Sequence, residues 1–150
     1  MVQWAVVAGY VLAIFLFSRN DVSGAGYTAE LLAKWFPHLS RAELRHYVFL
    51  LRKVGHVLAY GLLTFLAYLA ARKTKKLQAR PVLTAVLASL LVAAVDESYQ
   101  VHLQHRSGVW EDVLIDFLGI AAVGSGLWLA ARRRNKHKEV AEANVENERI

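Results

Sequence analysis

Four apolar stretches separated by charged connections constrain this chain of 150 residues more than any other feature. The stretches occupy residues 2–17, 54–71, 81–95 and 113–131. A bilayer core about 30 Å thick requires about 17–25 helical residues; two stretches reach this range, and the first and third need flanking residues. Backbone groups in lipid must form their hydrogen bonds internally, and the stretches lack strand-like alternation. The sequence therefore predicts an all-α integral membrane protein, a four-helix bundle.

The composition excludes several other classes of protein. The chain is 56% hydrophobic and 20% charged, so its charges are concentrated between the apolar stretches. A water-soluble bundle would keep a polar face on each helix, but residues 5–17 carry no charged side chain. The absence of cysteine excludes disulfides, thiol nucleophiles and cysteine metal sites. The net charge of +6 arises beside the membrane segments, so we expect membrane lipids, and not nucleic acid, as partners.

The distribution of lysine and arginine predicts the orientation of the bundle. Residues 72–80 and 132–138 hold ten basic residues in 16 positions, whereas residues 18–53 and 98–112 hold seven in 51. Cytoplasmic connections are enriched in these residues, so we expect both termini to be cytoplasmic. Residues 1–131 then form one membrane domain. Residues 132–150 form a basic and then acidic cytoplasmic tail, which we expect to be disordered or frayed.

The long outer connection is predicted to contain helical structure of its own. Ser40 and Glu43 have the spacing of a capping box, which predicts a helix that begins directly after Ser40. If this helix runs unbroken to Ala71 it exceeds the bilayer thickness, so its first third should project outward or bend near Gly55. A short amphipathic helix on the outer membrane surface is expected before Pro37. Its apolar residues are Leu31, Leu32, Trp35 and Phe36.

Polar residues gather at the outward ends of the last three stretches, and these are the candidate site residues. Charged groups at bilayer depth are costly, about 2.5–3.5 kcal/mol each on insertion scales, so they indicate function by default. On the second stretch Arg52, His56 and Tyr60 recur at every fourth position and share one helix face. The other candidates are Lys53 on the second stretch, Asp96, Glu97 and Gln100 on the third, Arg106 in the following turn, and Asp112 and Asp116 on the fourth.

Several of these residues also have ordinary structural explanations. Arg52 and Lys53 can extend to the headgroups, His56 can serve as a hydrogen bond between helices, and Asp112 is favoured by the helix dipole. Asp96 and Asp116 are harder to explain without partners, as is Glu97 beside Asp96. We therefore expect one charge-paired cluster in the outer leaflet. Small residues at every fourth position are expected to be helix-packing surfaces, namely Ala85, Ser89, Ala93, Ala122 and Gly126.

Three ordered motifs on successive membrane helices resemble those of the VanZ-like family. They are Arg52-Lys53-x-x-His56-x-x-x-Tyr60, then Asp96-Glu97-x-x-Gln100 with Arg106 six residues later, then Asp112-x-x-x-Asp116-x-x-Gly119. The resemblance covers most of residues 10–130, and family members often have Asn at the position of Asp116. It implies a bacterial cytoplasmic membrane protein. Founding members of the family are associated with low-level resistance to teicoplanin, but no settled biochemical activity accompanies the family name.

Two hypotheses assign the cluster to a lipid ligand. In the first, the protein binds a lipid headgroup, a lipid-linked cell-wall intermediate or a glycopeptide. Arg52, Lys53 and Arg106 would then hold phosphate, and the carboxylates would accept sugar or peptide donors. In the second, the protein is an intramembrane hydrolase or transferase in which His56 is the acid or base. Asp96 or Glu97 would orient His56 or act as a second base.

Other hypotheses need features that the sequence provides less clearly. A metal site would use His56 with the carboxylates, but no His-x-x-x-His pair supports it, and we expect neither a metal nor another cofactor. A proton-coupled transporter would relay protons through the same acids, and four short helices would then require a homo-oligomer. A purely structural role also remains open.

Overall fold

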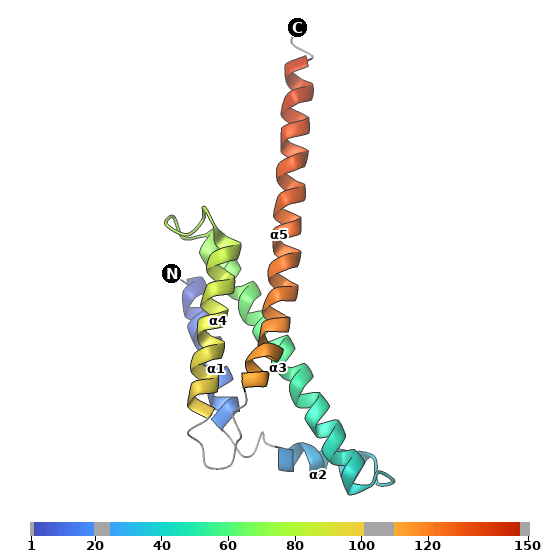
Figure 1. Cartoon of the computed structure of the whole chain (residues 1–150). Helices are drawn as coiled ribbons and strands as arrows, with labels where there is room; N and C mark the ends of the chain where they lie inside the picture. Colours follow the sequence, from blue (N-terminus) through green and yellow to red (C-terminus); the bar gives the residue numbers. More distant parts are fainter. Residues whose placement is uncertain (1, 20–24, 101–109, 148–150) are drawn as a thin grey trace.

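The computed structural model describes residues 2–19, 25–100 and 110–147, and the regular secondary structure in these ranges is helical throughout, with short turns between helices. Its helices are α1 (Val2–Arg19), α2 (Ala25–Trp35), α3 (Arg41–Arg72), α4 (Pro81–Gln100) and α5 (Trp110–Asn147). Helix α3 is central, because α1, α2, α4 and α5 all pack against it. The start of α1, the turn between α3 and α4, and the second half of α5 lie at one end of the molecule (Figure 1). We call this the basic end, after the exposed cations of residues 72–80 and 132–136.

Three helices are long and apolar enough to cross a membrane: Arg41–Arg72, Pro81–Ser98 and Val113–His137. The apolar part of α1, Val2–Phe17, is shorter. The outward faces of the bundle carry large apolar side chains, including Leu58 and Leu91, each 66% exposed, and Leu118, 60% exposed. Polar residues are buried while leucines are exposed, which is the reverse of a water-soluble bundle. The fold is that of an integral membrane protein.

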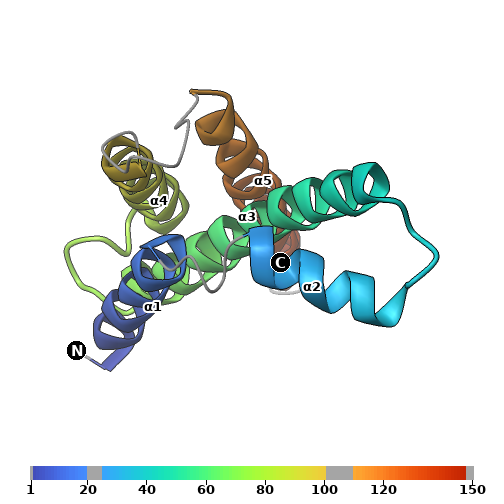
Figure 2. The same ribbon diagram turned by 90° about the horizontal axis from the view of Figure 1, so that it is seen from below.

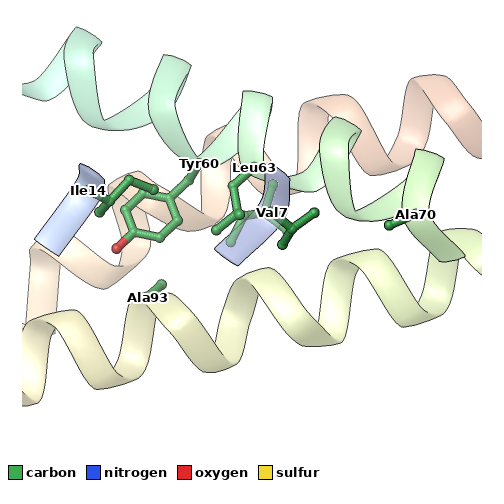
Figure 3. Close-up of a cluster of buried hydrophobic side chains, with 7 residues drawn as sticks. Val7, Ile14, Tyr60, Leu63, Ala70 and Ala93 are labelled. Atoms are coloured by element: carbon green, nitrogen blue, oxygen red, sulfur yellow. The ribbon is translucent and has the colours of Figure 1, made fainter. Parts of the chain in front are cut away.

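A small core holds α1, α3 and α4 together (Figure 3). Tyr60 and Leu63 of α3 are 1% exposed and lie beside Ile14 of α1 and Ala93 of α4. Small side chains on α4 allow this close packing, because Ala85, Ser89 and Ala93 are fully buried. The second small-residue stripe behaves differently: Ala122 and Gly126 are exposed. This stripe therefore does not pack against another helix of the chain, since lipid is as apolar as a neighbouring helix and both accept such a stripe.

Two hydrogen bonds attach the short helix α1 to α3 and to the turn that follows it. The indole Nε1 of Trp4 donates to Thr74 Oγ1 over 2.9 Å, at the basic end. Farther along α1, the hydroxyl of Tyr10 donates to the carbonyl of Ala59 over 3.2 Å. Helix α1 is therefore held by polar contacts with the protein as well as by its apolar surface.

Helix α3 begins at the predicted capping box. The Ser40 hydroxyl accepts the Glu43 amide over 3.3 Å, and a carboxylate oxygen of Glu43 accepts the Ser40 amide over 2.8 Å. The helix then runs for 32 residues without interruption to Arg72, which corresponds to about 48 Å. The first third leaves the bundle at the end opposite the basic end (Figure 1). This matches the predicted projection, and no bend near Gly55 is needed.

Replacing Ser40 with alanine is expected to loosen the start of α3 while leaving the bundle intact. Loss of such a cap costs about 0.5–2 kcal/mol, and here the affected turn is exposed. Hydrogen exchange should become faster at residues 41–46 and stay unchanged at residues 60–71. Equal acceleration in both segments would contradict a local role for the cap.

Helix α5 continues to Asn147, whereas the sequence analysis predicted a disordered or frayed tail from residue 132. Residues 132–144 are alanine, arginine, lysine and glutamate in large part, and these are strong helix formers. The helix is already nucleated within the membrane, so its continuation does not carry the cost of starting a new helix. Arg132 also lies over the ring of Trp128, 5.1 Å from its centroid, which supports the turn at which α5 leaves the apolar region.

Candidate functional site

A pair of polar side chains connects α3 with α5 inside the bundle. The imidazole Nδ1 of His56 lies 3.0 Å from Oδ1 of Asp116. The Asp116 side chain is only 2% exposed, while that of His56 is 25% exposed. Asp116 therefore fixes the ring from the buried side, and His56 is the member of the pair that remains accessible. A ligand contact would use the second ring nitrogen, Nε2, because Nδ1 is engaged by Asp116.

A second pair connects α3 with α4. The Tyr60 hydroxyl donates to Oδ2 of Asp96 over 3.2 Å, and both residues are 1% exposed. The rings of His56 and Tyr60 are stacked one helical turn apart, with centroids 6.4 Å apart and planes inclined by 23°. Glu97, next to Asp96, is also buried, at 7% exposure. All three carboxyl groups, those of Asp96, Glu97 and Asp116, lie close enough to act electrostatically on Tyr60.

Glycines bring the backbones of α3 and α5 together beside the His56–Asp116 pair. A β-carbon on Gly119 would overlap the carbonyl oxygen of Val57 and lie 2.9 Å from its carbonyl carbon. A β-carbon on Gly61 would lie 3.2 Å from Val123 Cγ2 and 3.5 Å from the Gly119 oxygen. Gly119 is one turn from Asp116, so this close crossing sets the distance over which Asp116 reaches His56.

Two cations lie on α3 one turn from the cluster, toward the start of the helix. Arg52 and Lys53 are both half-buried. Arg52 precedes His56 by four residues and shares its helix face. The Lys53 ammonium group lies over the ring of Phe49, 4.6 Å from its centroid, and so extends back toward the end of α3 that leaves the bundle. This direction is the one expected of a lysine that extends toward headgroups from within the membrane.

The structure thus brings together His56, Tyr60, Asp96 and Asp116, with Glu97 beside them. Three other candidates lie outside the described residues or side chains: Arg106, and the side chains of Gln100 and Asp112. One pairing differs from the expectation from sequence. The predicted orienting partner of His56 was Asp96 or Glu97, but the hydrogen bond described here joins His56 to Asp116, and Asp96 accepts from Tyr60.

The arrangement supports hydrogen bonding and proton exchange. Within residues 2–19, 25–100 and 110–147, no three histidine, aspartate or glutamate side chains are arranged to hold a metal ion. A buried carboxylate beside an imidazole stabilises the protonated ring and fixes its orientation. The protonated ring is a donor for an anionic group such as phosphate, and the neutral ring is a base.

The sequence analysis did not identify Gly61 as part of the site's support. The sequence does place both glycines close to polar site residues. Gly61 directly follows Tyr60 on α3, and Gly119 lies one turn after Asp116 on α5. Small residues next to a polar helix face indicate close approach of two backbones.

Helices long and apolar enough to cross a membrane, holding a histidine beside a buried tyrosine and buried carboxylates, define an integral membrane protein with a polar site inside its bundle. The profile of the VanZ/LLP1 family matches residues 4–132, which include every described residue of this site. The chain belongs to this family, as its three motifs indicated. Comparison with curated proteins and with solved structures gave no match.

Proposed function

We propose that this protein binds the headgroup of a membrane lipid or of a lipid-linked cell-wall intermediate through the cluster around His56. The observation that carries the proposal is the His56–Asp116 pair, in which a buried carboxylate holds a partly accessible imidazole. A phosphate group would accept a hydrogen bond from the protonated ring of His56. It would also form an ion pair with the guanidinium group of Arg52, four residues away on the same face. The buried carboxylates of Asp96 and Glu97 lie on α4 within the same cluster, and Asp96 accepts the Tyr60 hydroxyl, so they would support the site from beneath the headgroup.

The proposed setting is the cytoplasmic membrane of a bacterium, with the basic end in the cytoplasm and the site in the outer leaflet. Exposed cations on α5 and on the α3–α4 turn support this orientation. A lipoglycopeptide antibiotic such as teicoplanin is a further ligand of the proposed class, since it presents sugars and peptide groups to the outer face. A homo-oligomer is compatible with the exposed small residues of α5.

The binding proposal is tested by identifying the lipids that co-purify with the protein. Mass spectrometry of the wild-type protein should show a lipid species enriched over the bulk membrane. His56→Ala should lose this species, because the ring that contacts the headgroup is gone. Leu58→Ala, two residues away on the lipid-facing side of α3, is the matched control and should retain it. Equal lipid profiles for the wild type and His56→Ala would contradict the proposal.

A second candidate function, an enzyme acting on the same lipid, is favoured by the hydrogen bond between His56 and Asp116. A carboxylate that orients an imidazole is the usual support of a general base. Two hydroxyls on the same helix, those of Tyr60 and Thr64, are buried and donate to Asp96 and to a backbone carbonyl respectively, so the proposed nucleophile is water. In an enzyme, His56→Ala would retain the enriched lipid and abolish its conversion, which separates this candidate from a binder.

A further inference from the structure

Helix α2 presents an exposed apolar stripe although it packs against α3. Tyr27, Leu31 and Trp35 recur at every fourth position and are 57%, 46% and 72% exposed. The charged residues of α2, Glu30 and Lys34, lie on the neighbouring face and are exposed as well. Helix α2 lies across the axis of the bundle at the end opposite the basic end, and Figure 2 shows its length beside α3. It is therefore an amphipathic helix parallel to the plane that the membrane surface would occupy.

The start of α3 shows where this surface lies. Its polar residues from the capping box to Arg45, which are Ser40, Arg41, Glu43 and Arg45, are all exposed. They are followed by exposed apolar side chains, which are Tyr47, Phe49, Leu50 and Leu51, between 43% and 54% exposed. A change from exposed polar to exposed apolar residues along one continuous helix is expected at a lipid headgroup boundary. Lys53 extends back toward this boundary, with its ammonium group over Phe49.

We infer that α2 and residues 41–51 of α3 form a membrane-binding platform that rests in the headgroup layer. The occupant of its apolar side is lipid at the boundary between headgroups and acyl chains. Three observations support lipid: the platform is continuous with a membrane-spanning helix, its helix α2 lies across the bundle axis, and its exposed stripe contains Tyr27 and Trp35. Tyrosine and tryptophan prefer the headgroup level, and amphipathic helices bury their apolar face there. The platform does not depend on the lipid proposed for the His56 site.

The platform is tested by thiol labelling at two adjacent residues of α2, since the chain has no cysteine of its own. Leu31→Cys places a thiol on the apolar stripe, and Glu30→Cys places one on the charged face. In lipid vesicles, a membrane-impermeant maleimide should label Leu31→Cys more slowly by about tenfold or more, because apolar surroundings suppress the reactive thiolate. In denaturing detergent the two rates should become equal. Equal rates in vesicles would overturn the platform.

Quenching of Trp35 by brominated lipids distinguishes lipid from a second copy of the chain. The variant with Trp4, Trp110 and Trp128 replaced by phenylalanine keeps Trp35 as its one tryptophan. Bromines near the headgroup should quench its fluorescence more strongly than bromines near the bilayer centre. Absence of quenching at every depth would mean that Trp35 contacts water or protein, and would overturn the assignment.

Discussion

Replacing Asp116 with leucine is expected to destabilise the bundle more than any other single substitution at the site. Asp116 is 2% exposed and lies 3.0 Å from His56, so the variant leaves the imidazole without its carboxylate partner. Breaking a buried ion pair by removing one member costs about 3–5 kcal/mol. We expect the lower part of that range, because His56 retains partial exposure. The unfolding temperature of the purified protein in lipid nanodiscs measures the effect.

Asp116→Asn is the matched variant. The amide oxygen can still accept a hydrogen bond from Nδ1, so the bundle should lose less than half as much stability as with leucine. A double-mutant cycle with His56→Ala should show that the two residues are coupled. If the effects of Asp116→Leu and His56→Ala simply add, the hydrogen bond does not contribute to stability.

Replacing Gly119 with alanine is expected to have the second largest effect. The added β-carbon would overlap the backbone carbonyl of Val57, and a backbone cannot move aside as a flexible side chain can. Overpacking of this kind costs about 1–3 kcal/mol. It should also separate α3 from α5 and lengthen the contact between His56 and Asp116. The unfolding temperature reports the first effect, and loss of the co-purifying lipid reports the second.

Gly126→Ala provides the control on the same helix. A β-carbon at Gly126 would have no atom within 4 Å, so this substitution should leave stability unchanged or raise it slightly, since alanine favours helix. Equal destabilisation by Gly119→Ala and Gly126→Ala would mean that the close crossing of α3 and α5 is not what holds the site.

Local patterns in the sequence predicted much of the fold. Ser40 and Glu43 marked the start of α3 because a capping box is satisfied by neighbours in the chain. Arg52, His56 and Tyr60 lie at every fourth position. This spacing predicted their shared helix face, because it too depends only on neighbours along the chain. The partner of His56 could not be predicted in this way. Whether His56 meets Asp96 or Asp116 depends on how each helix is rotated about its own axis, and this rotation is set by contacts such as Gly119 against Val57.

Lipid exposure limited the sequence analysis in a second way. The stripes containing Ala85 and Ala122 look alike in sequence, yet Ala85 is buried and Ala122 is exposed. In a water-soluble protein an apolar stripe would be expected to be buried. In a bilayer an apolar stripe can face either lipid or another helix, so its composition does not predict which. The helical tail was missed because its composition was interpreted without the membrane helix that precedes and nucleates it.

The central position of α3 has a consequence for biosynthesis. His56 is translated before Asp116, which lies sixty residues later in the chain. Until α5 arrives, the nascent protein must retain its polar face in the insertion machinery or in a water-filled defect. A ribosomal product that stops before α5 should consequently be a substrate for membrane quality-control proteases, even though its first spans are apolar enough to insert.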